Sequence, residues 1–189
     1  MKNKPSFLFF FLFFFSYFHA ISSTNLIHQT CKRCSKTDPN LSYNFCVASL
    51  QSSPESRGAS NLRQLGSISI KLIKRNVTGT RHFIKELLII KNKTLTPYQK
   101  ACLKDCMELY SDAVSTIEET MEAYKSKHYA DANVELSSVV DAATSCEDGF
   151  GERKDVVSPL TKRNKDVFQL SAISLSIINM LINSFELIN

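Results

Sequence analysis

Apolar residues recur at intervals of three and four along most of the chain, which is the spacing of an amphipathic helix. Four long stretches carry this pattern, at about 58–91, 97–124, 129–150 and 159–185. Strand signals are scarce, because no Asn-Gly or Asp-Gly turn separates two alternating runs. Four such helices with short joints predict an all-α fold, an antiparallel up-down-up-down four-helix bundle over 58–186.

Capping and breaking residues mark the ends of these helices. Thr96-Pro97 and Ser158-Pro159 each combine a capping hydroxyl with a proline suited to the first turn of a helix. Gly149 and Gly151 are expected to end the third helix. Gly79 lies inside the first helix, where glycine is unfavourable, and is expected to weaken or bend it.

A shorter helical piece precedes the bundle. Residues 25–36 and 41–50 have helical spacing, and Asp38-Pro39-Asn40 provides a turn between them. Residues 54–58 include proline, serine and glycine and read as a linker. The sequence therefore predicts a helical hairpin over 24–54.

The N-terminus has the layout of a cleavable secretory signal. Lys2 and Lys4 precede an apolar run, Phe7–Phe18, and small residues follow it. The run is about twelve residues long, whereas a helix needs roughly twenty to cross a bilayer. We therefore expect residues 1–23 to be removed on export, which leaves a mature chain of 24–189 without a membrane anchor.

The chain has six cysteines, and in an exported chain disulfide bonds are the first interpretation of them, ahead of a metal site or a redox site. The Cys31-Lys-Arg-Cys34 spacing also suits a zinc site or a redox dithiol. Zinc would need two further ligands at a sensible spacing, and a redox dithiol would need a βαβ context. The sequence supplies neither, so we expect no metal and no cofactor.

The placement of the cysteines on the helices favours two pairs. Cys31 and Cys46 lie on opposite arms of the hairpin, where a bridge closes a loop of about fifteen residues and contributes roughly 3 kcal/mol. Cys106 and Cys146 lie on the inward faces of the second and third helices, so a bridge would clamp these two helices together. Two cysteines stay unassigned, as a third bridge, as free thiols or as exchange partners of their neighbours: Cys34 and Cys102.

Charge is segregated along the mature chain. Residues 24–104 hold fourteen Lys and Arg against three acidic residues, a net charge of +11. Residues 105–148 hold eleven Asp and Glu against two Lys, a net charge of −9, and 149–189 are nearly balanced at +1. In one interpretation these acids are solvated and pair with the basic first helix. In the other, part of the acidic surface steers a basic partner protein to this chain.

Several segments resemble the plant invertase and pectin methylesterase inhibitor family. They are Thr30-Cys31-Lys32, Asp38-Pro-Asn-Leu-Ser-Tyr-Asn-Phe-Cys46-Val, Leu65-Gly-Ser-Ile-Ser, Asp105-Cys-Met-Glu-Leu-Tyr110-Ser-Asp-Ala113, Tyr129-Ala-Asp-Ala-Asn-Val, Ser145-Cys-Glu-Asp-Gly-Phe150 and Gln169-Leu-Ser-Ala-Ile-Ser-Leu. The resemblance covers 24–185 and implies one inhibitor domain over 24–189, with the same two cysteine pairs. It also implies a secreted, non-catalytic protein of the cell wall (the apoplast) or the vacuole, whose partner is a plant enzyme.

Pectin methylesterase inhibitors of this family place their target contacts on acidic and hydroxyl residues of the second and third bundle helices. Carried over to this chain, the resemblance implies contacts at Glu108, Asp112, Ser115, Ser145 and Asp148. The first interpretation is therefore an inhibitor that covers the active-site cleft of a pectin methylesterase.

Invertase inhibitors of the family instead carry Pro-Lys-Phe at the joint between the second and third bundle helices. Here the joint reads Lys127-His128-Tyr129, which keeps an aromatic ring and a ring that can be cationic but lacks the rigid proline. Inhibition of a cell-wall or vacuolar acid invertase is therefore the alternative, with His128 and Tyr129 as candidate contacts. Tyr129 is also the first residue of the apolar seam of the third helix, so the alternative interpretation is that its side chain lies in the core.

Other function classes fit less well. An enzyme is not expected, because the chain has no Gly-rich phosphate loop and its four histidines are scattered. A helical lipid or ligand carrier is a remote alternative, since small residues on the core stripes leave room for a cavity. A nucleic acid partner is not expected of an exported chain. Three Asn-X-Ser/Thr sequons are candidate glycosylation sites: Asn40, Asn76 and Asn92.

Overall fold

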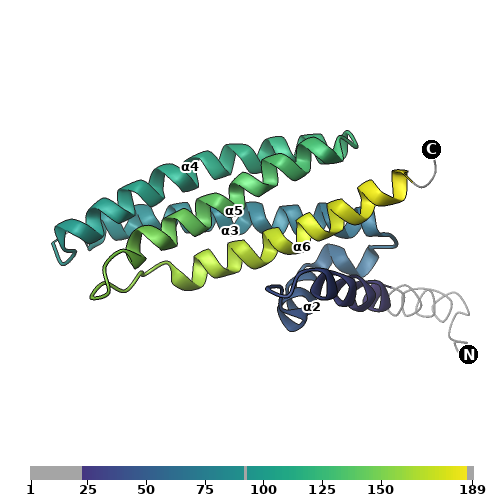
Figure 1. Ribbon diagram of the computed structural model, residues 1–189, viewed down its shortest axis with the longest axis horizontal. Coiled ribbons are helices and arrows are strands. Elements are labelled where there is room, and N and C mark those ends of the chain that lie inside the picture. Colours follow the sequence, from purple (N-terminus) through teal and green to yellow (C-terminus); the bar gives the residue numbers. More distant parts are fainter. Residues whose placement is uncertain (1–22, 92, 187–189) are drawn as a thin grey trace, which may run out of the picture.

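The computed structural model describes residues 23–91 and 93–186, so residues 1–22 of the predicted signal and the sequon residue Asn92 lie outside the described residues. The structure is all-helical (Figure 1). The predicted bundle is made by four long helices, listed in chain order: α3 (Leu62–Ile90), α4 (Pro97–Lys125), α5 (Tyr129–Gly151) and α6 (Thr161–Glu186). Each helix packs on the next, and α3 packs on α6 to close the bundle. The predicted four-helix bundle is confirmed.

The predicted helical hairpin precedes the bundle. Its first arm is described over 23–37 and its second arm is α2 (Tyr43–Ser52), which a 3₁₀ helix, η1 (Pro54–Gly58), links to α3. A disulfide joins Cys31 to Cys46 across the two arms. The hairpin lies along α3 and α6, on the side of the bundle away from α4 and α5 (Figure 1).

The side chain of Gln169 in α6 docks the hairpin on the bundle. Its Oε1 accepts a hydrogen bond from the backbone N–H of Ser42 (2.9 Å), and its Nε2 donates to the carbonyl of Asn40 (2.6 Å). The Ser42 hydroxyl in turn caps α2 by accepting from the N–H of Phe45. One amide therefore satisfies both backbone groups at the turn of the hairpin.

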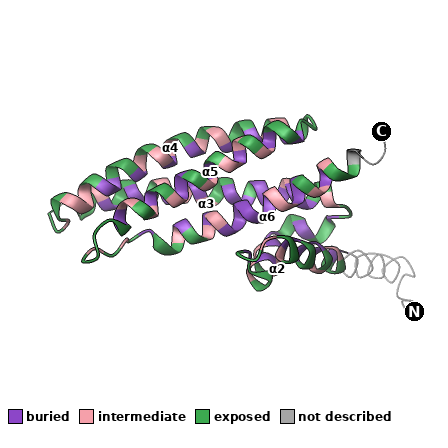
Figure 2. Ribbon diagram, in the orientation of Figure 1, coloured by how far each residue is buried: buried purple, intermediate pink, exposed green. Residues whose placement is uncertain are grey.

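Buried residues line the inner faces of the four bundle helices (Figure 2). On α4 the core seam uses Tyr110, which is fully buried, whereas the neighbouring Leu109 is only half-buried. A window of α6, Thr161–Ser184, is long and apolar enough to cross a membrane, but 56% of it is buried inside the bundle. This burial fits a core helix.

The predicted start of α3 needs correction. The helix begins at Leu62 and not at 58, because Pro54–Gly58 forms its own 3₁₀ turn and the side chain of Asn61 caps the start of α3 by accepting from the N–H of Gln64. The helix is continuous through Gly79. The predicted weakening or bend at this residue stays a prediction.

Candidate functional site

The residues predicted on α4 lie on one exposed stripe. Glu108, Asp112 and Ser115 are separated by four and three residues, so they share one face of the helix, and all three are exposed. Glu119 and Glu122 continue the same spacing and are exposed too. The stripe points away from the core, which α4 builds from the opposite face.

A second exposed stripe runs along α5. Ser145 and Asp148, both predicted as contacts, are exposed and belong to it. We call the two stripes together the acidic face, whose members are Glu108, Asp112, Ser115, Glu119 and Glu122 on α4 and Asp131, Val134, Ser138, Asp141, Ser145 and Asp148 on α5. Val134 is 72% exposed although it is apolar. The sequence analysis did not single out Val134. The signal that marks it is a valine on the polar side of the predicted apolar seam.

The disulfide between Cys106 and Cys146 sets the register of the two stripes. Its Cα atoms lie 4.9 Å apart, so these two residues are level in the antiparallel pair of α4 and α5. Moving in opposite directions from the bridge, Glu108 comes level with Thr144, next to Ser145, and Glu119 comes level with Asn133, next to Val134. The structure thus brings the predicted contacts of the two helices together on one surface.

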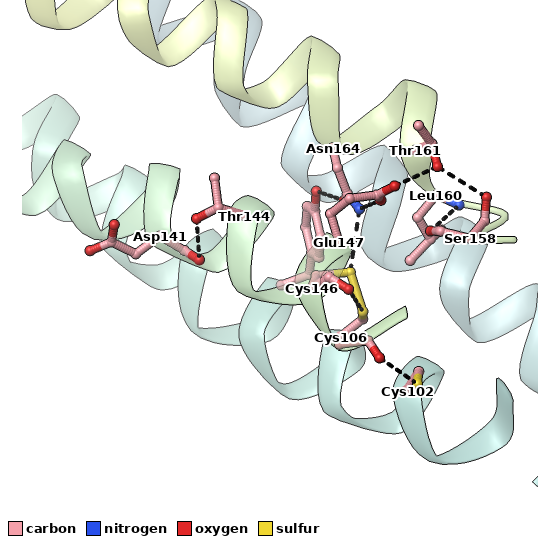
Figure 3. Close-up of a disulfide and its surroundings, with 12 residues drawn as sticks. Cys102, Cys106, Asp141, Thr144, Cys146, Glu147, Ser158, Leu160, Thr161 and Asn164 are labelled. Carbon is pink, nitrogen blue, oxygen red and sulfur yellow. Dashed lines mark hydrogen bonds between the residues drawn. A yellow bond between two sulfur atoms is a disulfide. The ribbon is translucent and has the colours of Figure 1, made fainter. Parts of the chain in front are cut away.

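A buried polar network supports this surface from behind (Figure 3). Asn164 of α6 donates to Glu147 Oε2 (2.6 Å), and Thr161 donates to Glu147 Oε1 (2.5 Å). Tyr110 of α4 donates its hydroxyl to Asn164 Oδ1 (2.7 Å). The Asn164 amide also contacts the sulfur of Cys146. Three helices are thereby fixed to one another next to the disulfide, which keeps the acidic face rigid.

The carboxylates of the acidic face are exposed. In the described part of the chain, the only ion pair between α3 and α4 joins Lys74 to Glu118 (2.9 Å), and Glu118 lies beside the face and not in it. No carboxylate of the acidic face forms an ion pair within the described residues. The exposure of these acids fits the interpretation that they are solvated, whereas pairing with the basic first helix is seen only at Glu118, outside the face, among the described residues.

Glu135 lies at the edge of the acidic face, where like charges meet. Burial raises the pKa of its carboxyl, and the nearby carboxylates of Glu119 and Asp131 raise it further, while the hydroxyl of Thr120 partly offsets them. Its Oε2 is buried and has no hydrogen-bond partner. This part of the α4–α5 surface is therefore a concentration of negative charge.

The joint between α4 and α5 is a tight turn with an exposed tip. Lys127 has a φ of 65°, and the N–H of His128 donates to the carbonyl of Ala123 (2.9 Å). Lys127 and His128 are both exposed, and the role of His128 as a contact stays a prediction. Tyr129 is not at the surface: it is only 5% exposed and packs edge-on against Tyr124, with ring centroids 5.3 Å apart. Of the two positions open to Tyr129, the structure favours the core.

The structure also answers which cysteines pair. The second disulfide joins Cys106 to Cys146, as the helical placement favoured, and the two cysteines left unassigned are free and buried. Cys102 donates to the carbonyl of Gly149 (3.4 Å). Burial raises the pKa of the Cys34 thiol to about 11. Neither thiol is placed as a reactive site.

Among the sequon residues, Asn40 is exposed at the hairpin turn and Asn76 is half-buried on α3. Both therefore remain candidates for glycosylation, with Asn40 the more open of the two. Glycosylation at either position stays a prediction.

The family model for plant invertase/pectin methylesterase inhibitors matches residues 25–177. The chain belongs to this family. The family is one of inhibitors, and the chain is an inhibitor-family protein and not an enzyme. It is 42% identical to a Platanus acerifolia protein named "Putative invertase inhibitor", over 96% of this chain and 99% of that protein. A Platanus orientalis protein of the same name is 43% identical over 84% of this chain and 91% of its own length.

Pectinesterase inhibitor 12 of Arabidopsis thaliana is 34% identical, over 85% of this chain and 90% of that protein. Among solved structures, the fold of this invertase/pectin methylesterase inhibitor family member resembles a mutant form of a pectin methylesterase inhibitor from Arabidopsis. The TM-score is 0.63 at 25% identity, over 73% of this chain and 89% of that one. The family thus contains relatives named for two different target enzymes.

Proposed function

We propose that the chain is a secreted inhibitor of a plant acid invertase (a β-fructofuranosidase) of the cell wall or vacuole. The observation that carries this proposal is the 42% identity, over nearly the whole chain, to a protein named as a putative invertase inhibitor. This similarity supports invertase inhibition, which was the alternative drawn from the sequence, over inhibition of a pectin methylesterase, which was the first interpretation. Inhibition is by occlusion: the rigid bundle covers the substrate cleft, and no covalent bond forms.

The tip of the α4–α5 joint has the chemistry for such a cleft. Glycoside hydrolases use a pair of carboxylates at the scissile bond, so their clefts are acidic at the centre. Lys127 and His128 are exposed at the tip and supply an ammonium group and an imidazole. The edge-on contact between Tyr124 and Tyr129 holds the tip from the core side. In this chain a buried tyrosine thus supports the turn in place of the missing proline.

Inhibition of a pectin methylesterase is the second candidate, and the acidic face favours it. An enzyme that acts on an acidic polymer has a cationic cleft, which a surface of unpaired carboxylates attracts. Glu108, Asp112 and Asp148 are exposed and have no ion-pair partner in the described residues. Val134 adds an exposed apolar residue to this face.

Two double variants separate the candidates. Lys127→Asn with His128→Ala removes the tip, and asparagine tolerates the positive φ of residue 127. Asp112→Lys with Asp148→Lys reverses charge on the acidic face and leaves the tip unchanged. Each is assayed with its disulfides intact against an acid invertase and a pectin methylesterase at mildly acidic pH. The far-ultraviolet circular dichroism of each variant serves as the control for folding.

The invertase proposal requires that the wild-type chain inhibits invertase and that the tip variant loses at least about tenfold in inhibition, the loss expected for one charge-assisted contact. The acidic-face variant should then inhibit invertase nearly as well as the wild type. Inhibition of the methylesterase alone, lost in the acidic-face variant and kept in the tip variant, would establish the second candidate in place of the first.

A further inference from the structure

Two adjoining hollows lie on the side of the bundle away from the acidic face. Both are bordered by α3 and share Leu72, Arg75 and Gly79 as a common wall. The first, of about 410 Å³, lies between α2, α3 and α6, and the second, of about 610 Å³, lies between α3 and the η1 segment. Together they form one groove between the hairpin and the bundle, which we call the basic groove.

Positive charge dominates the lining of the basic groove. Five cationic side chains face two carboxylates, and both carboxylates are already used: Lys71 pairs with Glu55, and Lys162 pairs with Asp166, each at 2.5 Å. Once these pairs are set aside, the arginines remain without a carboxylate partner. The groove therefore has unsatisfied positive charge that an anion would neutralise.

The two arginines enter the groove from different helices. Arg75 comes from α3 and borders both hollows, and Arg163 comes from α6 and borders the first. The guanidinium of Arg163 lies over the ring of Phe83, 4.3 Å from its centroid, which holds it in place. Neither guanidinium has an ion-pair partner among the described residues. A guanidinium binds a carboxylate through two parallel hydrogen bonds, so this pair suits a ligand with more than one carboxylate.

Gly79 is an independent sign that the groove is kept open. Glycine inside a helix costs about 1 kcal/mol relative to alanine. At Gly79 no packing explains that cost, because a Cβ added there would meet nothing within 4 Å, and its φ is not positive. The missing side chain leaves space in both hollows at their common wall. The glycine thus keeps the groove continuous.

We propose that the basic groove binds an acidic oligosaccharide, with carboxylates on Arg75 and Arg163. Hydroxyl groups of the sugar rings match the polar groups of Ser49, Ser52 and Asn76, which line the first hollow. The length of the groove over two hollows favours a chain of several sugars over a single small anion. This site is separate from the acidic face and from the tip, so it does not depend on the proposed function.

Binding is measured by isothermal titration calorimetry with the oxidised mature chain, produced without N-linked glycans because Asn76 lines the groove. The probes are an oligogalacturonate of about ten sugars, monomeric galacturonic acid, a neutral cello-oligosaccharide and inorganic phosphate. The first variant is Arg75→Gln. The second is Gly79→Leu, which fills the common wall with a strong helix former. The matched control is Lys85→Gln, which removes the same charge from an exposed position of α3 outside the groove.

We expect the oligogalacturonate to bind, more weakly as salt increases, and the neutral sugar not to bind. Arg75→Gln should weaken binding about tenfold, Gly79→Leu should abolish it while thermal stability is kept, and Lys85→Gln should have little effect. If phosphate or the monomer bound with the same affinity as the oligogalacturonate, an oligosaccharide would be refuted as the ligand. If Arg75→Gln and Lys85→Gln lost the same affinity, or if Gly79→Leu bound fully, the basic groove would be refuted as the binding site. Enzyme inhibition by the two groove variants should stay at the wild-type level.

Discussion

Replacing Gly66 by alanine tests the closest approach between α3 and its neighbours. A Cβ on Gly66 would overlap the hydroxyl oxygen of Tyr124 on α4 and lie 2.7 Å from its Cζ atom. It would also lie 2.9 Å from the Cγ2 atom of Ile177 on α6. Real side chains do not approach so closely, so α4 or α6 must move. The site lies where three helices meet and cannot relax toward solvent, because Gly66 and Tyr124 are both buried.

The magnitude follows from three contributions. Alanine is better than glycine inside a helix by about 1 kcal/mol. Against this, overpacking a core costs about 1–3 kcal/mol. Displacing Tyr124 also breaks the hydrogen bond from its hydroxyl to the carbonyl of Arg63 (2.9 Å), which costs about 1–3 kcal/mol for a buried group. The net result is a loss of about 1–5 kcal/mol in the free energy of unfolding for Gly66→Ala.

Gly79→Ala is the matched control on the same helix. It gains the same propensity, and its Cβ meets nothing within 4 Å, so it should stabilise the chain by up to about 1 kcal/mol. Both variants are compared with the wild type by urea unfolding, followed by circular dichroism with the disulfides intact. If Gly66→Ala proved as stable as the wild type, the close approach of the three helices would be refuted.

Three further predictions concern single sites. Burial, with two neighbouring carboxylates, raises the pKa of Glu135 in the folded chain. The contribution of this carboxyl to stability is therefore lost as the pH rises through that pKa. Glu135→Gln should raise the thermal midpoint at pH 7, and the difference from the wild type should vanish toward about pH 4. Because burial raises the pKa of Cys34 to about 11, iodoacetamide at about pH 8 should leave this thiol unmodified in the folded chain and label it after denaturation, as mass spectrometry can report. Cys106→Ser with Cys146→Ser opens a 40-residue separation and should lower the free energy of unfolding by about 4 kcal/mol in urea; a loss below about 1 kcal/mol would contradict the clamp.

The helices were predictable because each has an unbroken apolar seam and two of them have a capping signal in the sequence near their start. Thr96 illustrates this, since the sequence marks it as a cap and the structure shows a full capping box with Gln99. Choices between adjacent residues were not predictable. On α4 the seam takes Tyr110 over Leu109, because the tyrosine hydroxyl finds a buried partner in Asn164. Leucine is the more hydrophobic of the two residues, so hydrophobicity alone would place Leu109 in the core. Tyr110 takes the core position only because Asn164 on the neighbouring helix α6 accepts a hydrogen bond from its hydroxyl.

The candidate surface was predictable in part, for a related reason. Helical spacing places Glu108 and Asp112 on one outward face of α4, and the disulfide framework fixes which face of α5 lies beside it. Spacing alone cannot place a residue at the end of a helix, and Tyr129 is such a residue. It packs against Tyr124 from the preceding helix, a contact that depends on the geometry of the turn at Lys127.

The segregation of charge takes on a physical meaning once the helices are in place. The basic groove lies between the hairpin, α3 and α6, and the acidic face lies on α4 and α5, so opposite charges occupy opposite sides of a rigid bundle. If the groove holds an acidic polymer, the carboxylates of the acidic face are repelled by that polymer, which turns this face toward solution. The chain immobilised on a polygalacturonate gel should then inhibit its target as well as the free chain does. Loss of inhibition on the gel would mean that the polymer covers the docking surface, and the two sites would not be independent.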